Sequence, residues 1–144
     1  MEIASSPGQA HWYDFEFCLK FPTLQEFPNV TEIESLRVQL REFAASRDWG
    51  QYHSPKNLAM ALLVEAAELL ETFQWLSEEQ SRKLAPEALA AASDEVADVL
   101  LYLIRLSDEL GIDPIASANR KILANAKKYP VHKARGNSKK YTEL

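Results

Sequence analysis

Two pairs of acidic residues have a spacing that suits a divalent metal ion. Glu65 and Glu68 lie three residues apart, and Glu95 and Asp98 repeat that spacing. On an α-helix, side chains three residues apart share one face. Two neighbouring carboxylates repel each other, and burying them is costly unless a cation, a donor or a proton compensates. Hard divalent cations prefer carboxylate oxygens, so the two pairs predict a metal site.

The other residue types favour Mg²⁺ at this site, with Mn²⁺ as a substitute. Carboxylate-bridged di-iron bundles place a histidine three residues after a glutamate, and neither acidic pair has one. The residues that bind softer metals are scattered along the chain: His11, Cys18, His53 and His132. An all-oxygen site favours Mg²⁺ or Mn²⁺, and such ions commonly bridge protein carboxylates to substrate phosphates.

The first acidic pair lies in a predicted helix, from Pro55 to about Trp75, that is apolar nearly all round. Its apolar residues include Leu58, Ala61, Leu62, Leu63, Val64, Leu69, Leu70 and Phe73. Such a helix is normally buried. The alternative, that Glu65 and Glu68 simply reach solvent at the edge of a bundle, is disfavoured by these flanking residues. So much apolar surface on a small chain also favours association between copies.

The second pair lies in a predicted helix from Pro86 to about Leu110. This helix has a polar side that includes Asp94, Asp98, Arg105 and Glu109, so Glu95 and Asp98 alone would be interpreted as a solvated face. Their significance comes from the first pair. Two helices joined by a short connection lie antiparallel, and their acidic pairs can then converge on one cation cluster.

Capping signals and prolines divide the rest of the chain into further helices, which predicts an all-α helical bundle. A capping box at Thr31 and Glu34 opens a helix to about Arg47, and Ser54 caps the helix that starts at Pro55. The remaining signals are Ser77 with Gln80 for a short turn, Gly111 as a helix end, and Asp113-Pro114 opening a helix to about Pro130.

The two ends of the chain differ from this helical region. Residues 14–21 alternate apolar and polar side chains, which predicts a short strand or extended arm. We therefore divide the chain into an N-terminal arm over residues 1–30, a helical catalytic domain over 31–130 and a basic, irregular tail over 131–144. Half of all Lys and Arg residues lie from Arg120 onward. They could bind the phosphates of a substrate or simply form a solvated basic tail.

Composition excludes several functional classes. The formal charge of −5 argues against a binder of nucleic acid polymers, which usually needs basic excess. No apolar run approaches the ~18 residues of a membrane span, and Met1 to Ala4 shows no feature of a signal peptide. One cysteine among 144 residues fits a reducing compartment. We expect a cytoplasmic protein that binds a small phosphorylated substrate.

Several segments, taken in order, resemble the MazG-like pyrophosphohydrolases and, among them, the dCTP pyrophosphatase subfamily. The matching segments are Arg47-Asp48-Trp49, Pro55-Lys56-Asn57-Leu58, Glu65-Ala66-Ala67-Glu68, Phe73-Gln74-Trp75, Glu95-Val96-Ala97-Asp98 with Tyr102, Asn125 to Val131, and Lys139 to Leu144. The resemblance covers about residues 33–144. Either acidic pair alone would be a weak signal, whereas the ordered set is specific.

The resemblance implies a role for each matching residue. Mg²⁺ would be coordinated by Glu65, Glu68, Glu95 and Asp98. Substrate would be contacted by Trp49 and Trp75 at the base, by Tyr102 at the sugar, and by Asn125 and Lys128. The resemblance also implies all-α dimers or tetramers whose sites form at a subunit interface. Leu40 stands where the mammalian members have a base-contacting histidine, which leaves the base preference open.

The expected function is Mg²⁺-dependent cleavage of a nucleoside triphosphate to the monophosphate and pyrophosphate, with dCTP or a related dNTP as substrate. A glutamate of the first pair, Glu65 or Glu68, is the expected catalytic base. Three alternatives remain at this stage: a phosphoribosyl-ATP pyrophosphohydrolase, a non-catalytic helical interaction module, and a regulator that binds nucleotide without cutting it.

Overall fold

A computed structural model describes residues 32–143, and every regular element in this part of the chain is a helix, which confirms the all-α prediction. The main helices are α1 (Glu32–Ala45), α2 (Pro55–Glu71), α4 (Pro86–Glu109) and α5 (Pro114–Lys128). Shorter helical segments are η3 (Trp49–Tyr52), α3 (Glu78–Ser81), α6 (Val131–Ala134) and η4 (Tyr141–Glu143). The predicted strand in 14–21 and the cap at Thr31 lie outside the described residues.

Local signals set most of the helix starts. The Ser54 hydroxyl accepts a hydrogen bond from the Asn57 backbone N–H at the start of α2, and the Asp113 carboxylate accepts one from Ala116 at the start of α5. Ser77 and Gln80 form the predicted capping box. Gly111 follows α4 with a φ of 62°, a conformation that glycine adopts without strain.

Two segments differ from the sequence predictions. Helix α2 ends at Glu71, before Trp75, and residues 72–75 form turns. The sequence does not show this end, because no glycine or proline marks it. The C-terminal tail is not irregular throughout, since α6 begins directly after Pro130, a residue that can precede a helix but cannot continue one.

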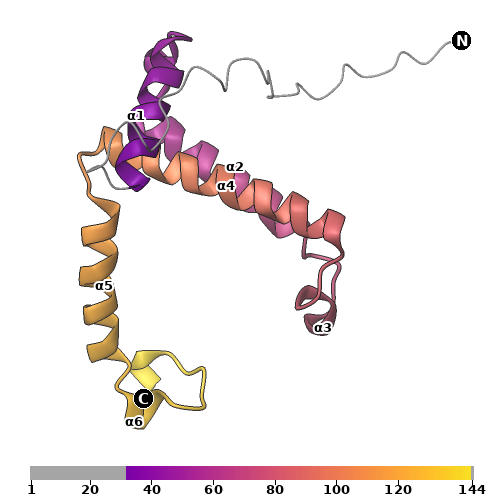
Figure 1. Cartoon of the computed structure of the whole chain (residues 1–144). Helices are drawn as coiled ribbons and strands as arrows, with labels where there is room; N and C mark the ends of the chain where they lie inside the picture. The colour runs from indigo at the N-terminus through magenta and orange to yellow at the C-terminus, as the bar shows by residue number, and fades with distance from the viewer. Residues whose placement is uncertain (1–31, 144) are drawn as a thin grey trace, which may run out of the picture.

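Helices α2 and α4 lie side by side as an antiparallel pair, and α1 crosses the C-terminal half of α4 (Figure 1). Leu58 of α2 and Ile104 of α4 form the centre of the small core, with 1% and 2% of their surface exposed. Helix α5 points away from this group (Figure 1). A cleft of about 590 Å³ lies among α1, the end of α4 and the start of α5, and its lining contains none of the four predicted metal ligands.

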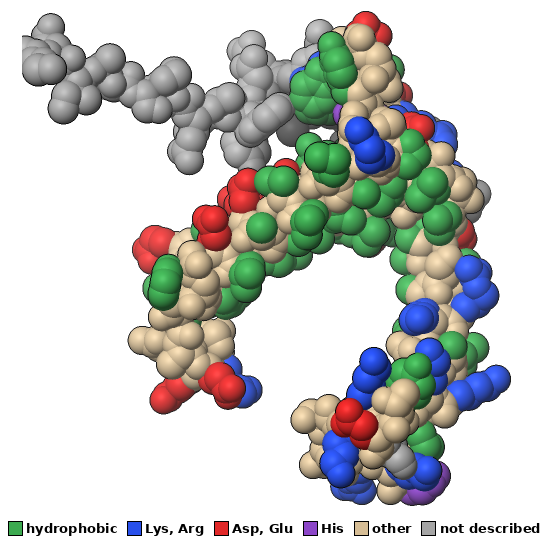
Figure 2. Space-filling view, turned by 180° about the vertical axis from the view of Figure 1, so that it is seen from behind, with side chains coloured by type: hydrophobic (Ala, Val, Ile, Leu, Met, Phe, Trp, Pro, Cys, Tyr) green, Lys and Arg blue, Asp and Glu red, His purple; other side chains and the backbone are tan. Residues whose placement is uncertain are grey.

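The expected burial of α2 is wrong for the single chain. Leu63 and Leu70 of α2 are 71% and 64% exposed, and Val96, Leu100 and Leu103 of α4 are also exposed. Apolar side chains run along the α2–α4 pair, with acidic side chains at one edge (Figure 2). The other described helices leave these faces uncovered.

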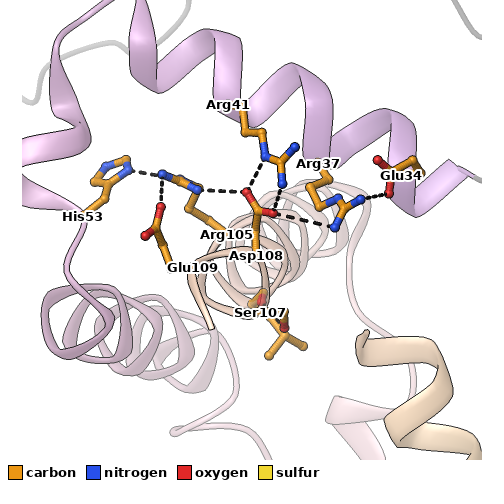
Figure 3. Close-up of polar contacts among 9 residues, drawn as sticks. Glu34, Arg37, Arg41, His53, Arg105, Ser107, Asp108 and Glu109 are labelled. Carbon is orange, nitrogen blue, oxygen red and sulfur yellow. Dashed lines mark hydrogen bonds and ion pairs between the residues drawn. The ribbon is translucent and has the colours of Figure 1, made fainter. Parts of the chain in front are cut away.

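An ion-pair network holds α1 against α4 (Figure 3). The Asp108 side chain of α4 is only 4% exposed and accepts hydrogen bonds from Arg41 of α1 at 2.7 and 2.5 Å and from Arg105 at 3.0 Å. Arg37 lies 3.7 Å from the same carboxylate and also pairs with Glu34. The hydrogen bond from Arg41, together with the three positive charges, lowers the Asp108 pKa.

We expect Asp108→Ala to destabilise the fold by about 3 kcal/mol, because it removes the nearly buried carboxylate that pairs with Arg37, Arg41 and Arg105 together. Since the folded-state pKa of Asp108 is lowered, its contribution is complete above the unfolded-state pKa of about 3.9 and is lost as pH falls below that value. Urea unfolding at neutral and acidic pH measures both effects. Glu78→Ala removes an exposed ion pair with Arg82 and should cost little; equal losses for the two variants would contradict this account.

Candidate metal and nucleotide site

The antiparallel packing of α2 and α4 brings three of the four predicted metal ligands together. Glu65 of α2 and Glu95 and Asp98 of α4 are each half-buried, and one carboxylate oxygen from each lies within 4.8 Å of the others. Glu68 is exposed and lies outside this group, although its charge acts on both Glu65 and Glu95. The convergence expected from the two acidic pairs is therefore found for three of their members.

Among the described residues, no cationic side chain compensates the charge of the three carboxylates. Within residues 32–143, no lysine, arginine or histidine forms an ion pair with Glu65, Glu95 or Asp98. Burial, followed by the neighbouring negative charges, raises the pKa of Glu65 and of Glu95. Burial and the charge of Asp94 raise the pKa of Asp98. Oxygen donors this close, partly desolvated and repelling one another, fit a divalent cation.

Tyr102 lies one helical turn after Asp98, on the same side of α4. Its ring is half-buried, and its pKa is raised by burial and by the charges of Glu65 and Asp98. The phenol is thus placed beside the carboxylate cluster, as expected for a residue that contacts a substrate held there.

Trp49 lies in η3, the segment that leads into α2. Its ring makes an edge-to-face contact with Phe43 of α1, at 5.7 Å between centroids, and another with His53, at 6.1 Å. Asp48, just before η3, has a left-handed φ of 53°, and Gln51 donates hydrogen bonds to both its carboxylate and its carbonyl. These contacts fix the position of Trp49, whereas Trp75 is 87% exposed in the turn after α2.

Asn125 and Lys128 lie on α5, and the described chain does not bring them to the carboxylate cluster (Figure 1). Lys128 instead places its ammonium 4.9 Å from the ring centroid of Tyr141, which also packs against Tyr129. If these two residues contact the substrate, a second copy of the chain must supply them.

His53 and Arg105 meet at the end of the site, although neither is among the residues predicted from the sequence to form it. The Arg105 Nε–H donates a hydrogen bond to His53 Nδ1 at 3.3 Å. The i, i+3, i+4 spacing of Arg105, Asp108 and Glu109 was a usable signal for ion pairs within α4. Nothing in the local sequence indicates the contact with His53.

We expect Mg²⁺ to raise the melting temperature, because it neutralises carboxylates that repel one another in the folded state. The stabilisation should weaken as pH falls: Mg²⁺ binds the deprotonated carboxylates, and their raised pKa values make protonation begin above the ordinary carboxyl range of about 4. Thermal melts with and without Mg²⁺ at about pH 8 and about pH 5 test this. An equal Mg²⁺ effect in Glu95→Gln would refute binding at this cluster.

Comparisons with known proteins place these features in a family. The sequence matches the MazG-like family over residues 60–144. It is 40% identical to dCTP pyrophosphatase 1 of Bos taurus, over 82% of this chain and 71% of the relative, and 41% identical to that of Homo sapiens, over 78% and 67%. A crystal structure of a pyrophosphatase from Archaeoglobus fulgidus is similar, with a TM-score of 0.67 and 43% identity over 71% of this chain and 95% of that one. The chain therefore belongs to the MazG-like family.

Proposed function

We propose that this protein is a Mg²⁺-dependent nucleoside triphosphate pyrophosphohydrolase that converts dCTP, or a closely related dNTP, to the monophosphate and pyrophosphate. The 40–42% identity to dCTP pyrophosphatases supports the reaction class. The observation that carries the proposal is the cluster of Glu65, Glu95 and Asp98, whose charge nothing in the described chain balances. None of the described helices could span a membrane.

Glu65, Glu95 and Asp98, joined by Glu68, would hold the metal. When bound, Mg²⁺ would offset their charge and that of the phosphates and would polarise the α-phosphate. A water attacks the α-phosphorus and gives its proton to a glutamate of the first pair. The bond from that phosphorus to the α–β bridging oxygen breaks, and pyrophosphate leaves with the bonding electrons. Glu65 is the half-buried member of this pair and lies within the cluster, which favours it over the exposed Glu68 as this base.

The nucleoside would lie along α4, from the carboxylates toward η3. Asp98, Tyr102 and Arg105 share one face of α4, and His53, beside Trp49, meets that face at Arg105. Phosphates at the carboxylates would therefore place the sugar near Tyr102 and the base near Trp49, where an aromatic face can stack on it. Trp75 lies beyond the opposite end of α2 from Trp49, about 25 Å away along the helix axis, so it could reach the same base only from a second copy of the chain.

The working enzyme is proposed to be a homo-oligomer with sites shared between subunits. The exposed apolar residues of α2 and α4 continue on α5 with Ile115, Ile122 and Leu123. A second copy packed on this surface would bury it and could bring Asn125 and Lys128 to the carboxylates of its neighbour. The distinction between dimer and tetramer is left to measurement of molecular mass.

A panel of canonical nucleoside triphosphates with Mg²⁺, scored for pyrophosphate against orthophosphate, tests the proposal. We expect pyrophosphate and a monophosphate in equal amounts, with deoxycytidine substrates among the best. Phosphoribosyl-ATP belongs in the same panel as the substrate of the related helical enzymes. Saturable dNTP binding without product would instead indicate a regulator, and neither binding nor product would indicate an interaction module.

A further inference from the structure

The guanidinium of Arg105 makes three contacts at the end of the site distant from the carboxylates (Figure 3). Its Nη1 lies 3.0 Å from Asp108, its Nη2 lies 2.5 Å from Glu109, and its Nε donates to His53 Nδ1 at 3.3 Å. The side chain is only 11% exposed. The two carboxylates fix the plane of the guanidinium, and this plane sets the direction in which Nε–H points.

The contact with His53 defines the state of its imidazole. Arginine can only donate, so Nδ1 of His53 must accept and cannot carry a proton. The ring is therefore neutral, with its proton on Nε2. Burial and the charge of Arg105 lower the His53 pKa, which agrees with this state, while Glu109 opposes the shift.

The same imidazole is one of the two rings in edge contact with Trp49. A chain of contacts thus runs from Asp108 and Glu109 of α4 through Arg105 and His53 to Trp49. Phe43 of α1 packs against Trp49, and the Arg47 guanidinium lies over the Phe43 ring, with its Cζ 3.6 Å from the ring centroid. Helix α4, which carries two of the proposed metal ligands, therefore orients Trp49 through His53.

We propose that Arg105 is a positioning residue for the nucleobase end of the site: by donating to His53 Nδ1 it holds the imidazole that orients Trp49. The proposal rests on the proposed function for the role of Trp49 toward the base. It predicts a defect in substrate binding, since Arg105 acts on the base pocket and not on the carboxylates that serve the chemical step. Lysine could not replace it, because an ammonium lacks the planar fork that contacts three acceptors in fixed directions.

A purely structural role is the competing explanation, because Arg105 also helps to hold Asp108 and thereby α1. Arg41 provides the matched control. It donates to the same Asp108 carboxylate, from α1, but makes no contact with His53. Arg41→Met therefore weakens the α1–α4 network and spares the link to Trp49.

Steady-state kinetics of the full chain separate the two roles. Arg105→Met and His53→Phe should each raise KM about tenfold, the loss of one hydrogen bond of ordinary strength, and leave kcat within about twofold. The double variant should be no worse than either single variant. Arg41→Met should lower the melting temperature without raising KM. A KM raised as much by Arg41→Met as by Arg105→Met would overturn the proposal, as would unchanged KM in both Arg105→Met and His53→Phe.

Fluorescence tests the same link without substrate. In a Trp12→Phe/Trp75→Phe protein, Trp49 is the sole tryptophan. Acrylamide quenching of Trp49 should increase with Arg105→Met or His53→Phe in that background and stay unchanged with Arg41→Met. If the wild-type chain released no pyrophosphate from any nucleotide, the proposed function would fail, yet this quenching would still test the link. Unchanged quenching in both Arg105→Met and His53→Phe overturns the proposed link to Trp49.

Discussion

Glu65→Gln should lower kcat by about 10³-fold and yet raise the melting temperature measured without metal. The loss of turnover follows from removing a metal ligand that is also the favoured base, a role worth roughly 10²–10⁴-fold. The gain in stability follows from the raised pKa of Glu65: its carboxylate is less favourable in the folded than in the unfolded state, so stability falls as pH rises through that pKa. Glutamine has the same shape without the charge.

Asp94→Asn is the matched control for this variant. Asp94 precedes Glu95, is exposed, and raises the pKa of both Glu95 and Asp98 by its charge, but it lies outside the carboxylate cluster. Its replacement should change kcat by less than about tenfold. Added Mg²⁺ should raise the melting temperature of Asp94→Asn but have little effect on Glu65→Gln. Full activity in Glu65→Gln would refute the metal site.

Mixing two inactive variants should restore activity if the site is shared between subunits. Lys128→Ala lacks the proposed substrate contact on α5, and Glu65→Gln lacks the carboxylate on α2. After exchange of subunits in an equal mixture, about a quarter of the sites in a dimer would combine an intact α2 with an intact α5. Pyrophosphate release by the mixture, compared with each variant alone, measures this recovery.

The outcome distinguishes two arrangements of the site. If Lys128 reaches the carboxylates of its own chain, every site in the mixture has one defect and its activity stays at the average of the two variants. The control mixture pairs Glu65→Gln with Asp98→Asn, two changes within one cluster, and should show no recovery under either arrangement. Recovery in the mixture of Lys128→Ala with Glu65→Gln, but not in the control mixture, supports a site that spans two subunits.

The sequence alone determined the helices whose ends carry local signals. The caps at Ser54 and Asp113, the capping box at Ser77 and the stop at Gly111 all lie where predicted. These signals work because each satisfies the unpaired backbone groups at a helix end through neighbouring residues. The resemblance to the MazG-like family, drawn from the ordered acidic, aromatic and lysine-tyrosine-proline segments, was also correct.

Only the tertiary structure decided which acids meet. Successive side chains on an α-helix are rotated by about 100° around its axis, so residues three apart, such as Glu65 and Glu68, point about 60° apart. That angle is enough for one side chain to face α4 and the other to remain exposed. Sequence periodicity defines a helix face but not the position of the neighbouring helix on it, so the split of this pair could not be predicted.

The tertiary structure also decided the contact between Arg105 and His53 and the exposure of α2. Arg105 and His53 are 52 residues apart, and their contact exists because the antiparallel pairing places the start of α2 beside the end of α4. The apolar composition of α2 predicted burial, but composition cannot say which chain provides the cover. Burial depends on every surface within reach, and the described helices of one chain leave Leu63 and Leu70 exposed.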